Sequence, residues 1–284
     1  MPKFTKIWYA QKTGLWDELN QHLLRVGFAP TIDLGSAHDW FRLAYKTRSR
    51  IYKMKDQWKG KTVVCVGNGP SLNETELDML NGAYVIGTNR AFHLLDKILP
   101  AAFQLIVQDN QRLAELEEEI RQLRCKVLIG SWYFTANSRP PKWISHSKKN
   151  IAVYLPKLDW QYDNQKLKVC GSLLTRFSDD PTGGVYYGYS VIFSAIQFAA
   201  YFGASRIVCI GIDMDFSKGV SFQPEVRNVF PTFDYDLHGR PMFEMMKTVL
   251  GNLGIDLINA TPGGKVNAIT RLTLRDAMSL PRAA

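Results

Sequence analysis

The chain has 284 residues, of which 46% are hydrophobic and 21% charged, so it holds enough apolar material for one large α/β domain with an extension. Its longest apolar stretch, residues 191–204, is interrupted by Ser194 and Gln197 and is too short to span a bilayer. The net charge of +9 favours anionic partners, such as nucleotides, phosphosugars, acidic glycans or an anionic membrane surface.

The cysteines and the first residues indicate a cellular compartment. Cys65, Cys125, Cys170 and Cys209 are widely spaced, without the spacing of metal ligands, and all but Cys170 lie inside apolar runs. Free thiols of this kind are typical of a reducing cytoplasm. The first six residues lack the apolar segment of a signal peptide. We therefore expect a cytoplasmic protein that can rest on the inner face of the cell membrane.

Residues 1–59 are predicted to be a basic, helical extension. Apolar residues recur at helical spacing in 40–45, and basic residues then crowd 42–61 together with Tyr52 and Trp58. The interpretation that we favour is a solvated helix whose aromatic residues pack on the main domain. The alternative is a basic and aromatic face that touches anionic lipid or glycan. No nucleic-acid-binding motif accompanies the charge, so a nucleic acid is not an expected partner.

A glycine turn follows the first predicted strand, Thr62–Val66, which is short and rich in β-branched residues. Gly67-Asn68-Gly69-Pro70 can pass close to a ligand, because glycine has no Cβ. Ser71 and Glu74 have the spacing of a capping box, which predicts a helix over 72–80. A strand, a glycine turn and a helix N-terminus together can bind a phosphate, although the same pattern also serves ordinary βα turns.

Strands and helices alternate along the rest of the chain. Further strands are predicted at 83–88, 103–107, 126–129, 151–155, 206–210 and 255–258, and helices at 111–124, from 181 to about 202, and at 241–253. This alternation predicts an α/β fold with a doubly wound, mostly parallel, Rossmann-like sheet. The catalytic domain would cover 60–272, with lid-like, loop-rich insertions at 131–182 and 214–240 and a tail at 273–284.

Polar residues follow the predicted strands at the point where each strand ends. They are Asn68, Asn89 with Arg90, Gln108 with Asp109, Asp213, and Asn259 with Thr261. Each alone is an ordinary turn residue. In open α/β sheets, however, ligands bind outside the carboxyl ends of the strands, so their convergence predicts a ligand site there.

Several reaction classes are disfavoured because their motifs are absent from the sequence. There is no P-loop, no dinucleotide fingerprint, no nucleophile elbow and no His-rich or Cys-rich metal cluster. Asp213 and Asp215 have the spacing of a carboxylate pair that could hold a divalent ion. Such pairs are common, so a metal site is an alternative here and is not the favoured interpretation. His238, in an irregular loop beside the predicted edge, is the best candidate general base, against the alternative of a solvated loop histidine.

Six short motifs together resemble the MptE-like domain family. They are GKTVVCVGNGPSLN (60–73), GTNR (87–90), VQD (107–109), GGVY (183–186), IGID (210–213) and NATPGGK (259–265). The archaeal namesake of that family is a 6-hydroxymethylpterin diphosphokinase, and many bacterial members accompany surface-glycan and flagellin glycosylation. The order of motifs is also similar, more loosely, to bacterial lipooligosaccharide sialyltransferases, which use CMP-sialic acid, need no metal and use a histidine base. The resemblance covers about residues 60–272.

The resemblance implies roles for particular residues. The nucleotide would contact Asn68, Ser71 and Asn89, with Gly183 and Gly184 opening a helix beside it, and His238 would match the sialyltransferase base. The glycine turn and the strand ends themselves add further expected nucleotide contacts, which are Gly67, Gly69, Arg90, Gln108, Asp109, Asn259 and Thr261, and they make Asp213 a second candidate catalytic residue. One departure is Asp215, a carboxylate that would repel a phosphate unless a metal ion or a basic side chain intervenes.

Three functions are consistent with these residues. The leading one is a glycosyltransferase that uses a nucleotide-activated sugar, such as a CMP-linked acidic sugar, without a cofactor, on a glycan or glycolipid acceptor. The second is an ATP- and Mg²⁺-dependent diphosphokinase, with Asp109, Asp213 and Asp215 at the metal. The third is a nucleotide- or glycan-binding accessory module. Assembly into a homo-oligomer stays open.

Overall fold

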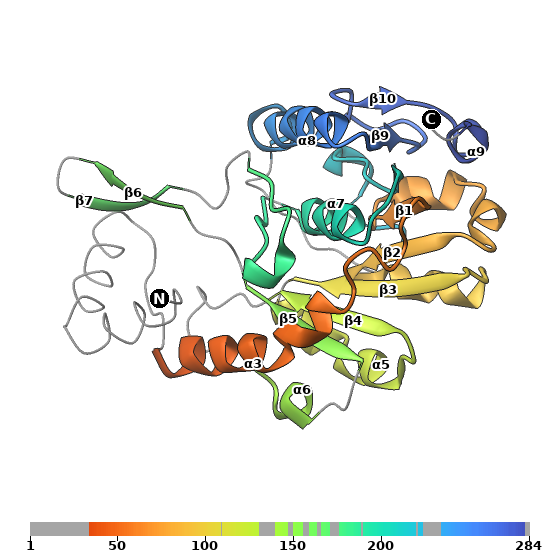
Figure 1. Ribbon diagram of the computed structural model, residues 1–284. Coiled ribbons are helices and arrows are strands. Elements are labelled where there is room, and N and C mark those ends of the chain that lie inside the picture. Colours follow the sequence, from red (N-terminus) through yellow and green to blue (C-terminus); the bar gives the residue numbers. More distant parts are fainter. Residues whose placement is uncertain are drawn as a thin grey trace.

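The computed structural model describes residues 34–108, 110–130, 140–146, 150–155, 159–163, 166–170, 176–188, 190–219, 221–223 and 234–281. Its strands are β1 (Thr62–Val66), β2 (Tyr84–Thr88), β3 (Ala102–Val107), β4 (Lys126–Gly130), β5 (Ile151–Tyr154), β6 (Asp159–Asp163), β7 (Lys166–Cys170), β8 (Arg206–Ile210), β9 (Asp256–Asn259) and β10 (Thr270–Arg271). Eight of them form one parallel sheet in the order β10-β9-β8-β1-β2-β3-β4-β5, shown in Figure 1. The predicted parallel α/β sheet is confirmed.

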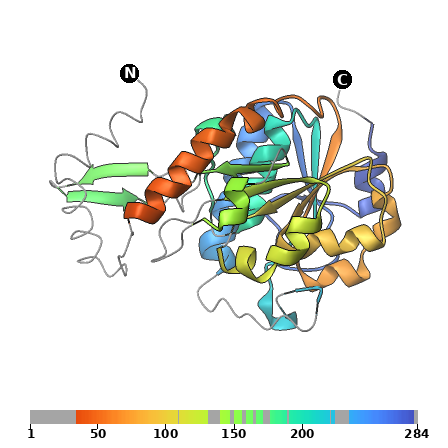
Figure 2. The same cartoon turned by 90° about the horizontal axis from the view of Figure 1, so that it is seen from below.

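Helices cover both faces of this sheet (Figure 2). They are α3 (Leu34–Tyr52), α4 (Asn110–Glu115), α5 (Glu117–Gln122), α6 (Lys142–His146), α7 (Val191–Tyr201), α8 (Arg240–Asn252) and α9 (Leu274–Ser279). Side chains of β1 show the two faces, because Val63 and Cys65 pack in one apolar cluster and Val64 and Val66 in another. This alternation follows from the two-residue period of a strand and confirms the doubly wound arrangement.

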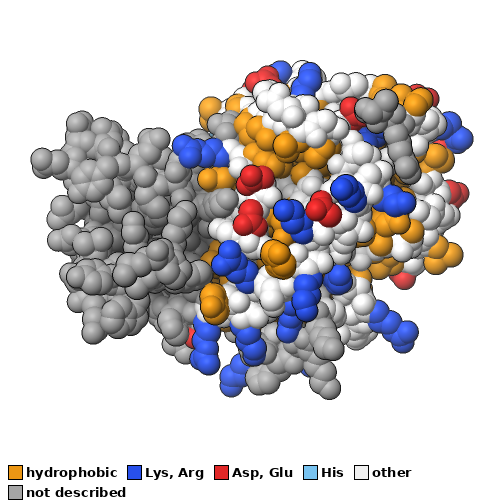
Figure 3. Space-filling view, in the orientation of Figure 1, with side chains coloured by type: hydrophobic (Ala, Val, Ile, Leu, Met, Phe, Trp, Pro, Cys, Tyr) orange, Lys and Arg blue, Asp and Glu red, His pale blue; other side chains and the backbone are white. Residues whose placement is uncertain are grey.

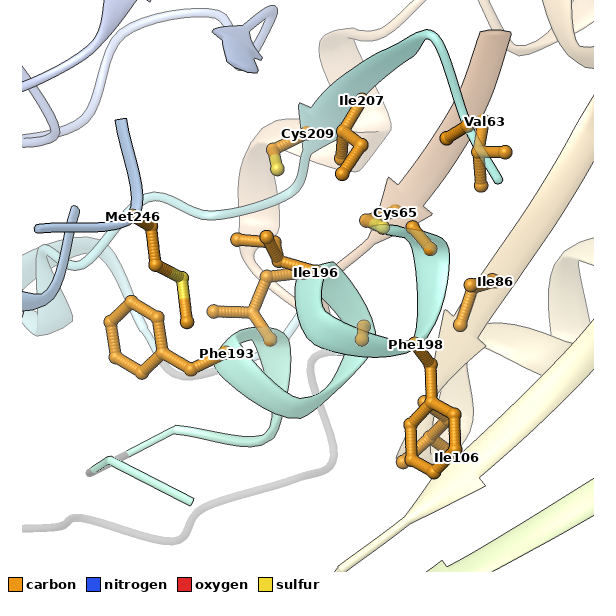
Figure 4. Close-up of a cluster of buried hydrophobic side chains, with 14 of the residues drawn as sticks. Val63, Cys65, Ile86, Ile106, Phe193, Ile196, Phe198, Ile207, Cys209 and Met246 are labelled. Carbon is orange, nitrogen blue, oxygen red and sulfur yellow. The ribbon is translucent and has the colours of Figure 1, made fainter. Parts of the chain in front are cut away.

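Helix α7 is the centre of the larger cluster. Nine of its eleven residues are buried, and in Figure 4 Phe198 lies beside Ile106 of β3 while Phe193 lies beside Met246 of α8. Its two polar residues, Ser194 and Gln197, are also buried, and both are hydrogen-bonded. Among the helices of the described residues, none combines the length and apolar character that crossing a membrane requires.

The smaller elements on the other face hold the remaining apolar residues. Two short helices, α4 and α5, take the place of the single helix predicted at 111–124, and Leu116 separates them. Leu113, Leu116 and Ile120 of this segment are buried in the core. Leu274 and Ala277 of α9 pack beside Val208 and Ile258. The last helix of the described chain is therefore part of the core.

The helix predicted over 72–80 is wrong in type. Two short 3₁₀ turns, Pro70–Glu74 and Leu77–Leu80, take its place. A capping box needs the Ser71 hydroxyl to accept from a backbone N–H of its own helix. Here that hydroxyl instead donates to the Asp213 carboxylate, 2.7 Å away, so the cap is not made.

The helix predicted from residue 181 begins only at Val191. Gly184 and Gly188 have φ values of 116° and 54°, which a helix cannot continue through. Gln197 holds the preceding segment against α7, because its side chain accepts from the Ser178 and Tyr186 N–H groups and donates to the Tyr186 carbonyl. After a 3₁₀ turn at Pro181–Gly183, residues 184–188 are therefore not helical.

The region 131–182, predicted to be loop-rich, contains more structure than the one short strand expected. Strand β5 extends the main sheet, and β6 and β7 form a separate antiparallel hairpin. Buried free thiols are confirmed for Cys65 and Cys209, which are paired neighbours on β1 and β8. Cys125 is also a free thiol and is half-buried, and burial raises its pKa to about 11.

Helix α3 covers the exposed edge of β5. The Val153 N–H donates to Thr47 Oγ1 at 2.8 Å, and Arg50 donates to the Ile151 carbonyl. These are backbone groups that an edge strand would otherwise offer to another chain. Trp40, Ile51 and Trp58 pack inward, as the favoured interpretation of the basic stretch expects, whereas Tyr52 does not pack on the main domain and is exposed.

Replacing Thr47 with valine should destabilise the protein, because the Val153 N–H would then be buried without an acceptor. We expect the free energy of unfolding to fall by about 1–3 kcal/mol in denaturant titrations. Thr248→Val is the matched control, since Thr248 is an exposed helical threonine that makes the same bond to the carbonyl four residues earlier. Equal losses in the two variants would show that α3 does not close this edge.

Candidate functional site

The strand order reverses between β1 and β8. From β1 the chain adds β2 to β5 on one side, and β8 to β10 lie on the other side. Such a reversal opens a crevice at the carboxyl ends of the two central strands, which is the usual ligand position in open α/β sheets. The turns after β1 and β8 are therefore the centre of the candidate site.

These two turns approach each other closely. A Cβ on Gly67 would lie 2.2 Å from the Gly211 carbonyl oxygen, and one on Gly69 would lie 1.7 Å from a carboxylate oxygen of Asp213. Only glycine fits at either position. The glycines predicted for close approach to a ligand are thus required by contact with the neighbouring turn.

The Asp213 carboxylate occupies the donors of the glycine turn. It accepts from the Ser71 N–H at 3.2 Å and from the Ser71 hydroxyl at 2.7 Å, and Asp213 is only 7% exposed. Burial raises the pKa of Asp213, and the two bonds from Ser71 partly oppose that rise. The donors of this turn therefore bind a carboxylate of the protein itself, and the phosphate predicted at the turn stays a prediction.

Asn68 links the turn after β1 to the turn after β2. Its side chain donates to the backbone and hydroxyl oxygens of Thr88, both at 2.9 Å, and accepts from the Arg90 N–H at 3.0 Å. Asn89 has a φ of 47°, a left-handed conformation that asparagine tolerates. Asn68 therefore shapes the site while its side-chain amide is fully engaged.

The end of β3 joins the same edge. Gln108 is buried and accepts from the Ser194 hydroxyl of α7 at 2.6 Å. The Glu115 carboxylate joins two arginines, with Arg90 at 3.2 Å and Arg112 at 2.5 Å. Asp109, predicted to contact the nucleotide, lies outside the described residues.

The loop after β9 completes the edge on the other side of β8. Asn259 is fully buried, donates to the Val266 carbonyl and accepts from the Thr261 N–H. The Thr261 hydroxyl accepts from the Ile212 N–H at 3.2 Å, which joins the loops after β8 and β9. Arg271 of β10 donates to several carbonyls of the same loop.

Asp213 and Asp215 are directed to different partners. Asp215 accepts from the N–H and the hydroxyl of Ser217, and the Lys265 ammonium lies 3.9 Å from its carboxylate. Within the part of the chain that the structure describes, no three His, Cys, Asp or Glu side chains gather as metal ligands do.

His238 lies in a π-helical turn, Tyr235–Gly239, that packs on the loop after β9. The Tyr235 hydroxyl donates to Asn267 and accepts from the N–H groups of Asn267 and Ala268. The Nδ1 atom of His238 accepts from the Asp234 N–H at 3.0 Å. Since a backbone N–H can only donate, Nδ1 carries a lone pair and the proton of the neutral ring is on Nε2.

Gly183 and Gly184 lie away from the centre of the site. The segment that follows them is bonded to the end of β5, through the Val185 N–H and the Leu155 carbonyl. Four strand positions separate β5 from β1. The structure therefore does not place these glycines where a helix would open beside a ligand at the β1 turn, and that expectation is corrected.

One of three comparisons with known proteins found a match. Residues 41–219, more than half of the chain, match the family described as 6-hydroxymethylpterin diphosphokinase MptE-like. The chain belongs to the MptE-like family. Searches of curated proteins and of solved structures found no match. The matched range of this MptE-like chain begins within α3 and includes the turns after β1, β2, β3 and β8.

Three residues of the MptE-like site were not predicted from the sequence. Thr88 lies in a quoted motif and takes part in the bonds of Asn68, and Lys265 ends another. Both could have been selected from their place at a strand end. Arg271 could not, because it acts on the loop from a separate strand twelve residues after Asn259.

The pH dependence of stability should report the buried Asp213 carboxylate. Because the folded-state pKa of Asp213 is raised, its contribution to stability is full below the ordinary aspartate pKa, about 4, and is lost as pH rises through the raised pKa. Relative to the native protein, Asp213→Asn should therefore gain stability between pH 4 and pH 7 in denaturant titrations.

Ser71→Ala should show the opposite trend. It removes a hydroxyl donor from a buried carboxylate, so its loss, about 1–3 kcal/mol at pH 7, should shrink toward pH 4. Parallel pH profiles for Asp213→Asn, Ser71→Ala and the native protein would contradict a buried, ionised Asp213 at this turn.

Proposed function

We propose that the protein is a glycosyltransferase that binds a nucleotide-activated sugar at the carboxyl edge of its sheet. The carrying observation is the Ser71–Asp213 contact at the strand reversal, where the donors of the glycine turn hold a buried carboxylate at the crevice. Nucleotide sugars carry many hydroxyl donors, so a buried carboxylate with remaining acceptor positions at this edge of the sheet suits them.

The carboxylate of Asp213 has capacity for a ligand. An ionised carboxylate has about four acceptor positions, and the bonds from Ser71 use two of them. Sugar or ribose hydroxyls would donate to the others. Burial raises the pKa of Asp213, which also makes this carboxylate a stronger base than an exposed one.

Lys265 can offset the repulsion between the Asp215 carboxylate and a nucleotide phosphate. A second carboxylate beside a phosphate would be repulsive, but the Lys265 ammonium stands 3.9 Å from it. A departing nucleotide phosphate would meet that ammonium and the Nε2–H of His238. The two carboxylates point to separate partners, which favours this reaction over one that needs them to share a divalent ion.

The proposed transfer forms a bond between an acceptor hydroxyl oxygen and the anomeric carbon of the sugar. The bond from that carbon to the phosphate oxygen breaks, and the nucleotide leaves with its electron pair. Asp213 accepts the hydroxyl proton, and His238 donates a hydrogen bond to the phosphate. With Nδ1 engaged by Asp234, the donor role of His238 fits its geometry better than the base role predicted from the sequence.

The family description supports a second candidate, the ATP- and Mg²⁺-dependent diphosphokinase. In that reaction Asp213 and Asp215 would have to turn toward one metal ion. A module that binds nucleotide without turnover is the third candidate. These candidates differ in which nucleotides they bind.

Thermal-shift measurements should separate the candidates. We expect CMP or CDP, with a chelator present, to raise the melting temperature by about 5 °C at a hundredfold excess over Kd. Stabilisation by ATP only with Mg²⁺ would favour the diphosphokinase. No response to any nucleotide would overturn both enzymes and leave only a glycan-binding accessory module.

His238→Gln and His238→Asn should differ if His238 acts as a donor through Nε2. The glutamine amide can place an N–H near the position of Nε2, whereas the shorter asparagine cannot. We expect His238→Asn to lose about 10²-fold in kcat and His238→Gln to keep most of that contribution. Equal losses in both variants would restore the base role.

A further inference from the structure

A second hollow lies between α3 and the 179–182 turn, on the side of the sheet that ends in β5. It is an open groove of about 700 Å³, a volume in the range of ligand sites. Its α3 wall carries Tyr45, Arg48 and Tyr52, and its other wall carries Asp179, Asp180 and Thr182. None of these residues takes part in the site at the β1 and β8 turns.

The walls of the groove are tied together. Arg48 donates to the Thr182 hydroxyl at 3.4 Å, and that hydroxyl donates to the Asp180 carboxylate at 2.5 Å. Asp180 also accepts from the Thr182 N–H, so the turn is held in one conformation. Walls joined by the protein's own hydrogen bonds make a pre-formed groove, which lowers the cost of binding.

The groove exposes aromatic rings in a regular array. Tyr45 is 65% exposed and Tyr52 is 69% exposed, although α3 buries its apolar face on the sheet. The two tyrosines are seven residues apart, hence on one side of the helix and about 10 Å apart along it. The buried Tyr201 also lines the groove. Burial and the nearby Asp180 raise the pKa of Tyr201 to about 12, so its hydroxyl stays protonated.

The charge of the groove selects the class of ligand. The lining holds Arg48 and Lys55 (+2) and Asp179 and Asp180 (−2), which sum to zero in a chain of net charge +9. Figure 3 shows Lys and Arg side chains spread over the lower part of the face that contains α3. A phosphate-rich or membrane ligand would favour that basic surface over a neutral groove.

We propose that this groove binds the acceptor glycan, as a neutral chain of linked sugars. A sugar ring presents C–H bonds on its faces and hydroxyls at its edge, so it can stack on tyrosine while its hydroxyls bond to adjacent guanidinium and carboxylate groups. The two tyrosine rings would hold successive parts of one chain. The role of this glycan as acceptor rests on the proposed glycosyl transfer. Binding of the glycan to the groove does not depend on that transfer or on a nucleotide.

The position of the groove sets the length of the acceptor. A small cavity lined by Tyr45, Leu155 and Thr182 places its upper end at the carboxyl end of β5. Four strand spacings, about 19 Å, separate that point from the turn after β1. A glycan that fills the groove must therefore be longer than a disaccharide to reach the reacting centre along the same edge of the sheet.

Calorimetry with a series of neutral hexose oligomers, from disaccharides to octasaccharides, tests the proposal on the full chain without nucleotide. The longer oligomers should bind more tightly, and Tyr45→Ala and Tyr52→Ala should each weaken their binding about tenfold. Lys46→Ala and Lys53→Ala are the matched controls, because these exposed basic residues of α3 and the segment after it do not line the groove. Melting temperatures of all four variants check that they fold.

Three results would overturn the proposal. They are no binding of any oligomer, binding that survives both tyrosine substitutions, or binding to phosphatidylglycerol vesicles that the two lysine substitutions abolish while no oligomer binds. The last would identify the basic face as a membrane contact. If oligomers bind through the tyrosines but no nucleotide stabilises the protein, the groove is a glycan site and only the proposed glycosyl transfer is overturned.

Discussion

The contact between Ser71 and Asp213 fixes the geometry of the candidate site. These residues are 142 positions apart in sequence, and their contact joins the turns that follow the two central strands. It depends on the absence of a Cβ at Gly69, since any side chain there would displace the carboxylate. The donors of the glycine turn thus hold an aspartate, which places a buried acceptor at the centre of the candidate site.

Around that contact, most polar residues of the edge bond to one another. Asn68 joins the turns after β1 and β2, and Thr261 joins the turns after β8 and β9. Backbone carbonyls and N–H groups take up much of this bonding, so these side chains stabilise loop conformations. Catalytic groups held by such a shell are positioned before a ligand binds, which is a requirement for effective catalysis.

The sequence was sufficient for seven of the eight described strands of the parallel sheet, all but β10, because buried parallel strands are short β-branched runs. It was insufficient where a side chain has two possible partners. Ser71 fits a capping box, but its hydroxyl bonds to Asp213, and Gln197 looks like an interruption of an apolar helix although it holds residues 178 and 186. Both outcomes depend on contacts between distant segments.

The same limit explains how α3 was interpreted from its sequence. Helical spacing of Trp40, Ala44 and Ile51 predicts a buried side, but periodicity does not show what that side covers. In the structure it covers β5, with Thr47 and Arg50 taking the backbone groups of that strand. With α3 packed in this way, the side chains of Tyr45 and Tyr52 are exposed to solvent on another side of the helix. A helix that closes the sheet therefore also forms one wall of a groove, and the same packing that protects the edge keeps two tyrosine rings in place for a ligand.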